Sequence, residues 1–190
     1  MFEADNLRVA LDTLGTLLLD RELSYEIVVV GGGGLLLLGL IRRPTKDLDA
    51  LALVENGKDV LANPLPDALV EAIADVAAVQ GLDDTWLNPG PTNQLKQGLP
   101  EGFSERTTRH VFGGLVVNLA GRVDQIHLKL YAAVDNDPKS KHVQDLIDLA
   151  PTGDELRVAG AWVKQQDAGV EFGGFVDSVV AHLEVALGRA

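Results

Sequence analysis

Two aspartates separated by one residue, Asp47 and Asp49, are the side chains in this sequence best placed to act together in a reaction. They open the segment DLDALALV, whose composition predicts a β-strand over residues 47–54. Because side chains alternate along a strand, both carboxylates should share one face and Leu48 should occupy the other. Two carboxylates on one face can hold a hard cation such as Mg²⁺ or Mn²⁺, with waters or substrate phosphates as its other ligands.

A cluster of four glycines, residues 31–34, lies a short distance before these aspartates. It follows YEIVVV, whose β-branched residues predict a buried strand over 25–30, and it precedes a helix predicted over 34–41. The spacing excludes a dinucleotide fingerprint, because leucine stands where the last glycine belongs, and a phosphate-binding loop, because no lysine follows the second glycine. The glycines could still allow close backbone approach to a polyphosphate at the helix N-terminus.

The order of strand, glycines, helix, basic pair and Asp-x-Asp resembles the minimal nucleotidyltransferase fold. In that fold a Gly-Gly or Gly-Ser motif opens a helix, and an Asp-x-Asp follows on the next strand. The order is also similar to the branch of AbiEii-type toxin nucleotidyltransferases and their uncharacterised bacterial relatives. The positions that carry the match are Gly31, Gly32, Arg43, Thr45, Asp47 and Asp49.

A second part of the chain supports the resemblance, which covers most of residues 25–165. In DQIHLKLYAA and KSKHVQDLIDL, Lys129 and Asp145 match a lysine and an aspartate of the branch, whereas His142 stands where an aspartate is common. The resemblance implies catalytic roles for Asp47, Asp49, Lys129 and Asp145. An alternative for Lys129 is a lysine at the edge of an apolar helix with its head group in water.

The resemblance also implies a nucleotide site and a third metal-binding carboxylate. The nucleotide would be bound by Gly31, Gly32, Gly33, Arg43, Thr45 and Arg106, the last of these in a long polar segment over 88–110 that could be a functional loop or a surface excursion. The strand LVVNLA offers only neutral Asn118 for the third carboxylate. Asp124, Asp135 and Asp145 stay open as substitutes.

The remaining pattern predicts an α+β fold, a minimal nucleotidyltransferase-like mixed β-sheet flanked by helices, with a helical C-terminal half. Helices are predicted over 5–20 and 67–81, and HVFGGLVVNLA predicts paired strands around two glycines. We expect a nucleotidyltransferase-like core over 1–120 and a helical region over 121–190 packed on it. Further helices are predicted over 122–135, 139–150, 153–166 and 175–187, the third opened by a capping box of Thr152 and Glu155.

Composition limits the partners. The net charge of −12 disfavours broad adhesion to nucleic acid or to anionic membranes. The sequence has no cysteine, no signal-peptide pattern at its start and no uncharged run long enough to span a membrane, so we expect a soluble, cytoplasmic protein without a membrane partner.

These observations favour a Mg²⁺-dependent nucleotidyltransferase, using an NTP as substrate and an RNA, a protein hydroxyl or a small molecule as acceptor. A catalytically degenerate relative that binds a nucleotide or a partner protein is the alternative, favoured by Asn118 and opposed by the intact Asp47 and Asp49. A toxin-antitoxin component held in check by an antitoxin, and a homo-oligomer, also stay open.

Overall fold

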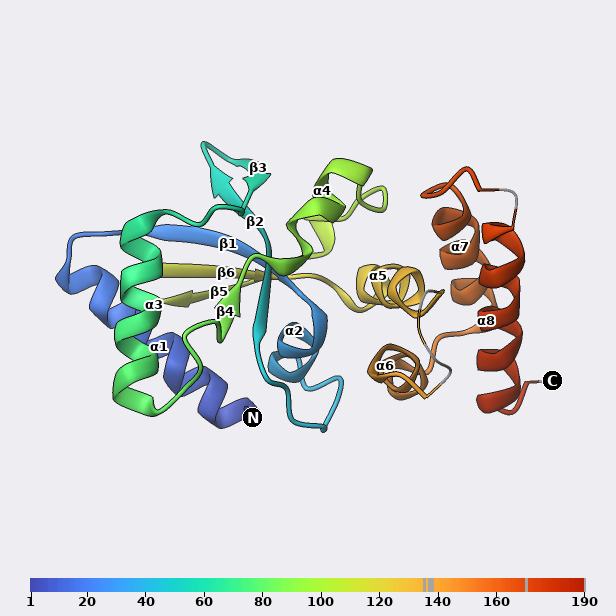
Figure 1. Cartoon of the computed structure of the whole chain (residues 1–190), viewed down its shortest axis with the longest axis horizontal. Coiled ribbons are helices and arrows are strands. Elements are labelled where there is room, and N and C mark those ends of the chain that lie inside the picture. Colours follow the sequence, from blue (N-terminus) through green and yellow to red (C-terminus); the bar gives the residue numbers. More distant parts are fainter. Residues whose placement is uncertain (135, 137–138, 170, 190) are drawn as a thin grey trace. The chain divides into compact units, whose positions relative to one another are not determined.

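The computed structural model describes residues 1–134, 136, 139–169 and 171–189, and the chain divides into two compact units, Met1–Ala120 and Gly121–Ala190. The predicted fold class is confirmed: a mixed sheet flanked by helices occupies the first unit, and the second is helical (Figure 1). Among the described residues, no helix is both long and apolar enough to cross a membrane.

The sheet of the first unit is mixed because two of its strand pairs are parallel. Its order is β3-β2-β1-β6-β5, with β4 paired to β2; β1 with β6 and β2 with β4 run parallel, and the other pairs run antiparallel. The strands are β1 (Tyr25–Val30), β2 (Leu48–Glu55), β3 (Lys58–Leu61), β4 (Leu87–Asn88), β5 (Thr108–Phe112) and β6 (Leu115–Leu119).

One face of this sheet forms the hydrophobic core with two helices. Along β6, Leu115, Val117 and Leu119 are buried, and they alternate with the more polar face that carries Asn118. Helix α1 (Ala4–Asp20) packs against β5 and β6 and lies beside α3 (Asp67–Gln80) (Figure 1). The apolar spacing that predicts both helices therefore reflects the burial of one side of each.

Helix α2 differs from the prediction at both ends. It spans Gly31–Leu37, so it begins at the first glycine instead of the fourth, and it ends before the predicted end at Ile41. The glycines are helical because their bare backbone packs against the chain that leads into β2, a tertiary contact that helix propensity does not include.

The polar segment over 88–110 is more ordered than its composition suggests. It contains the end of β4, a 3₁₀ turn η1 (Gly90–Thr92), helix α4 (Asn93–Gln97), a second 3₁₀ turn η2 (Ser104–Arg106) and the start of β5. Strand β3, which pairs with β2 across the turn after Glu55, was also missed. Both rely on contacts with the sheet, which local sequence patterns do not reveal.

The second unit consists of helices that match the predicted ones closely. They are α5 (Arg122–Val134), α6 (Lys141–Leu149), α7 (Gly153–Lys164) and α8 (Phe172–Ala186). The predicted capping box is present, with the Thr152 side chain accepting from the Glu155 amide and the Glu155 carboxylate accepting from the Thr152 amide. Asp135, one of the suggested third carboxylates, lies outside the described residues.

Candidate functional site

The ends of β1 and β2 bring the glycine cluster to the Asp-x-Asp motif. Val30, the last residue of β1, pairs with Asp49 in β2, and the chain passes from Val30 directly into α2. Gly31 has a φ of 75°, and a Cβ atom built there would lie 2.3 Å from Asp49 Oδ2. Only a glycine leaves room for the Asp49 carboxylate at this point, so the two motifs form one local structure.

A β-bulge sets the face on which Asp49 lies. Val28 pairs with Ala52 but Val29 pairs with Ala50, so one extra residue, Leu51, is inserted in β2. Without that insertion Val30 would oppose Ala50, and Asp49 would point to the other face. The bulge therefore places Asp49 on the same face as Val28 and its other neighbour, Asn118.

The next two glycines contact the chain that leads into β2. A Cβ on Gly32 would lie 3.1 Å from both Arg43 Nη2 and Thr45 Oγ1, and a Cβ on Gly33 would lie 2.9 Å from the Asp47 carbonyl oxygen. The Thr45 hydroxyl donates to that carbonyl at 3.3 Å. The structure thus brings Gly31, Gly32, Gly33, Arg43, Thr45, Asp47 and Asp49 together within the first unit.

The donor set at this point suits a hard cation. Asp47 and Asp49 are both partly exposed and flank buried Leu48. Asp47 also lines a surface hollow of about 360 Å³ with Lys46 and Asp83. The described residues contain no cluster of three or more His, Asp or Glu side chains, but Mg²⁺ commonly uses one or two carboxylates and completes its shell with water and substrate phosphate. The Asp49 carboxylate beside the bare Gly31 backbone supplies one such ligand, and Asp47, whose backbone carbonyl faces Gly33, carries a second carboxylate two residues earlier in the chain.

Asn88 is a neighbour that sequence reasoning did not single out. It pairs with Asp49 across the parallel β2–β4 ladder, and its Oδ1 accepts from the Gly90 amide at 2.9 Å. A Cβ on Gly90 would lie 3.9 Å from Asp49 Oδ1. The sequence gives little signal for Asn88, because the strand that positions it is two residues long and has no recognisable pattern.

Arg106 is held within its own loop. Its guanidinium donates to the Glu101 carbonyl at 2.8 Å and lies beside Gly102, where a Cβ would be 2.6 Å from Nη1. Arg43 donates to the Pro44 carbonyl at 3.3 Å and contacts Gly32. Of the two arginines predicted to bind nucleotide, Arg43 is the one that the structure places at the glycine cluster.

Asn118 occupies the position where a third carboxylate was sought, and a carboxylate lies next to it. Its Nδ2 donates to Glu26 Oε1 at 2.8 Å, and Arg109 Nε lies 3.9 Å from the same oxygen. Glu26 was missed, although a charged residue in the otherwise apolar segment YEIVVV could have revealed it. Burial and the nearby Glu26 charge raise the pKa of Asp59, which lines the same hollow as Glu26 and Asn118.

The second unit brings together the two residues that the resemblance singled out there. Lys129 Nζ of α5 lies 2.7 Å from Asp145 Oδ2 of α6, and the two side chains are 6% and 0% exposed. Lys129 is therefore a buried partner of an ion pair and not a lysine whose head group reaches into water. Asp124, another suggested third carboxylate, is also buried in α5.

Comparison with known families decides the class of protein. A family model described as "Nucleotidyltransferase of unknown function (DUF6036)" matches residues 6–151. The chain belongs to this family. The nucleotidyltransferase part of the resemblance is thereby confirmed, and a nucleotide is the substrate class that family membership implies. No curated protein and no solved structure showed significant similarity to the chain.

The span of the match relates the nucleotidyltransferase family to the two units. It includes the glycine cluster, the Asp-x-Asp motif and the sheet of the first unit, and it continues through α5 and α6 of the second. Helices α7 and α8 lie beyond it. The family sequence pattern therefore extends over both the Asp49 region and the Lys129–Asp145 pair.

Proposed function

We propose that the protein is a Mg²⁺-dependent nucleotidyltransferase that transfers an NMP group from an NTP to an acceptor hydroxyl. The observation that carries the proposal is the packing of Gly31 against the Asp49 carboxylate. A bare backbone beside the Asp49 carboxylate, with the Asp47 carboxylate two residues earlier, would provide the two features that a metal-bound triphosphate needs, close approach and oxygen ligands. Family membership supports the reaction class.

In the proposed reaction, the acceptor hydroxyl oxygen attacks the α-phosphorus and the bond to the bridging oxygen of pyrophosphate breaks. The hydroxyl proton passes to solvent, and pyrophosphate leaves with the electron pair of the broken bond. Asp47 and Asp49 would hold the Mg²⁺, which when bound would supply neutralisation of phosphate charge. Gly31, Gly32 and Gly33 admit the phosphates, and Arg43 and Thr45 flank them with donors.

Lys129 and Asp145 enter the proposal as the catalytic residues of the second unit. A lysine would be a strong electrostatic partner for phosphate charge, and its ion pair with Asp145 would orient it. Arg106 is proposed to bind nucleotide after its loop contact with Glu101 is exchanged for the ligand.

The similarity to AbiEii-type enzymes extends the proposal to a biological role. The protein would act in the cytoplasm as the toxin of a toxin-antitoxin pair, and an antitoxin partner would restrain nucleotidyl transfer. The acceptor would then be an RNA end, a protein hydroxyl or a small molecule.

A second candidate function is a nucleotide-binding or partner-binding protein without transfer. Asn118 favours it, because an amide hydrogen-bonded to Glu26 stands where a third metal-binding carboxylate was expected. The intact Asp47 and Asp49 favour the enzyme. The two candidates differ in whether the bound NTP loses its α-phosphoryl group to an acceptor.

The deciding experiment follows label from each α-labelled NTP, with Mg²⁺ or Mn²⁺, into RNA, protein and small-molecule fractions. The full chain should transfer label, and the near-isosteric variants Asp47→Asn and Asp49→Asn should lose it by at least about a hundredfold. Asp12→Asn, an exposed charge change on α1, is the matched control and should retain activity. Lys129→Met, checked for folding by circular dichroism, should also lose transfer.

Three other outcomes would count against the proposal. Transfer that survives in both aspartate variants would contradict the assignment of the site. Metal-dependent NTP binding without transfer would favour the binding protein. Absence of both transfer and NTP binding would overturn the nucleotide site altogether.

A further inference from the structure

A polar cavity lies on the same face of the sheet as Asp49. It has a volume of about 300 Å³, and its floor includes Glu26 and Val28 of β1, Asn118 of β6 and Asp59 of β3. Phe103 and Ser104, from the segment before β5, form part of its wall. We call this space the acidic cavity. Its size suits a small organic group.

The acidic cavity offers mostly hydrogen-bond acceptors. Asn118 is 8% exposed, its Nδ2 is used by Glu26, and its Oδ1 has no partner among the residues that the structure describes. The Asp59 carboxylate likewise has neither a hydrogen bond nor an ion pair within that part of the chain. A ligand that fits here must therefore donate hydrogen bonds.

The charges that line the cavity determine which charge its ligand should carry. Asp59 and Glu26 are close enough to interact, and the raised pKa of Asp59 comes from burial first and from Glu26 second. Arg109 Nε lies 3.9 Å from Glu26 Oε1, and because the Arg109 side chain is 57% exposed, it neutralises this pair only from the rim. A protonated amine carries both the positive charge and several N–H donors.

The register of β1 relates the acidic cavity to Asp49. Val30 pairs with Asp49, whereas Val28 and Glu26 of the cavity floor lie two and four residues earlier on the same face. At about 3.3 Å per residue, they are about 7 Å and 13 Å from the position of Val30 along the strand. One small molecule could place a hydroxyl near Asp49 and an amine in the cavity.

We propose that the acidic cavity binds a protonated amine of the acceptor, so that the acceptor is a small, hydroxylated amine. This inference rests on the proposed transfer reaction and narrows its acceptor class. It disfavours RNA, because a phosphate chain would approach two carboxylates on this face. A cation bound in the acidic cavity would also remove the repulsion between the Asp59 and Glu26 carboxylates.

The first test measures binding without NTP or metal. The probe is 1,3-diamino-2-propanol, and glycerol is its neutral counterpart, with hydroxyls in place of both amines. In amide NMR spectra of the full chain at neutral pH, the diamine should shift the signals of Val28, Gly57 and Ser104 at the cavity, and glycerol should not. Equal shifts from both probes, or no shift from either, would overturn the inference.

Charge variants make the same test specific to the cavity. Glu26→Gln and Asp59→Asn keep the shape of the side chains, and each should weaken diamine binding by about tenfold or more, the expected loss of a charge-assisted hydrogen bond. Glu71→Gln, on the exposed side of α3, makes the same charge change elsewhere and should have no effect. Amine binding that is equal in all three variants contradicts the assignment, and circular dichroism of each variant confirms folding.

A transfer assay separates this inference from the proposed function. With an α-labelled NTP and Mg²⁺, label should pass to 6-amino-1-hexanol, whose extended chain is long enough to reach from the cavity to the Asp49 region, and not to its neutral counterpart 1,6-hexanediol, and Glu26→Gln should reduce that transfer. Label transfer to other acceptors that is unchanged in Glu26→Gln and Asp59→Asn would overturn the amine site but support the transferase. Amine binding at the cavity without any label transfer would support the amine site and overturn the transferase. Cavity shifts produced by NTP alone would identify a nucleobase site instead.

Discussion

Gly31 is the residue where backbone conformation and close packing meet. Its φ of 75° belongs to the left-handed region, and its missing Cβ leaves the space that Asp49 Oδ2 occupies at 2.3 Å. Gly39 has a similar φ of 70° but has no atom within 4 Å of a built Cβ. The two positions therefore separate the cost of the backbone conformation from the cost of displacing a carboxylate.

We predict that Gly31→Ala is more harmful than Gly39→Ala. Gly39→Ala should lower the free energy of unfolding by about 1–2 kcal/mol, the cost of a left-handed alanine. Gly31→Ala should lose about 1 kcal/mol more through overpacking, and should reduce label transfer about a hundredfold by shifting Asp49. Urea unfolding and the transfer assay measure the two effects. Equal stability and equal activity of the two variants would contradict the contact.

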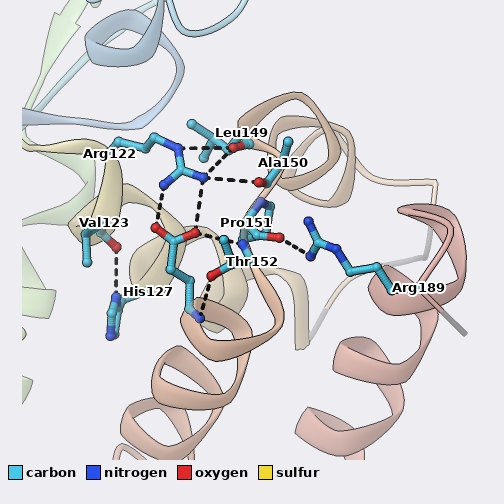
Figure 2. A network of polar contacts seen from close by, with 9 residues as sticks. Arg122, Val123, His127, Leu149, Ala150, Pro151, Thr152 and Arg189 are labelled. Carbon is cyan, nitrogen blue, oxygen red and sulfur yellow. Dashed lines mark hydrogen bonds and ion pairs between the residues drawn. The ribbon is translucent and has the colours of Figure 1, made fainter.

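At the scale of helices, Arg122 joins three elements of the second unit (Figure 2). Its guanidinium donates to the Leu149 carbonyl at 2.7 Å and to the Ala150 carbonyl at 3.2 Å, at the C-terminal end of α6. It also donates to Glu155 Oε1 at 2.5 Å, while Oε2 accepts from the Thr152 amide at 2.7 Å. The Arg122 side chain on α5 thus donates hydrogen bonds both to carbonyl groups at the end of α6 and to the carboxylate that caps the start of α7.

We predict that Arg122→Lys lowers the free energy of unfolding by about 1–3 kcal/mol, because an ammonium cannot reproduce the bidentate and carbonyl contacts. Arg157→Lys is the matched control. Its partner Asp154 is 88% exposed, so the change should stay within about 0.5 kcal/mol. Urea unfolding of both variants provides the comparison, and a similar loss in the two would show that the network adds little.

The same network predicts a pH dependence. The Arg122 hydrogen bond, followed by weaker contacts to Thr152, lowers the pKa of Glu155 below its usual 4.5. Ionised Glu155 therefore stabilises the fold fully above that value, and the contribution is lost as the pH falls through the lower pKa of the folded state. Thermal unfolding between neutral and acidic pH should show a smaller acid-side loss for Arg122→Lys than for the native chain.

At the scale of the whole molecule, net charge decides which macromolecules the chain can approach. With −12 at neutral pH, the long-range field repels phosphates. We predict that a short single-stranded RNA binds with a Kd weaker than about 10⁻⁴ M at physiological salt. Fluorescence anisotropy measures this. Micromolar binding that falls steeply with salt would instead show that the basic residues converge into an RNA site.

Local patterns were sufficient for most elements and for the pieces of the Asp49 region. The periodicity of α1 and α3, the capping box of α7 and the β-branched run of β1 depend on neighbouring residues, so the sequence predicted them. The glycines and the Asp-x-Asp were recognised for the same reason. The bounds of α2 and the existence of β3 were not, because packing against the sheet outweighs the local preference there.

The sequence by itself determined the α+β class, the charge and the motif that relates the chain to nucleotidyltransferases, since each is a property of composition or of short spacing. The tertiary structure alone decided which side chains share a face. One inserted residue, Leu51, places Asp49 on the same face of the sheet as Val28. Strand pairing brings Glu26 and Asn118 together although they are 92 residues apart in the sequence. Register is a property of paired strands, so no single segment could encode the acidic cavity.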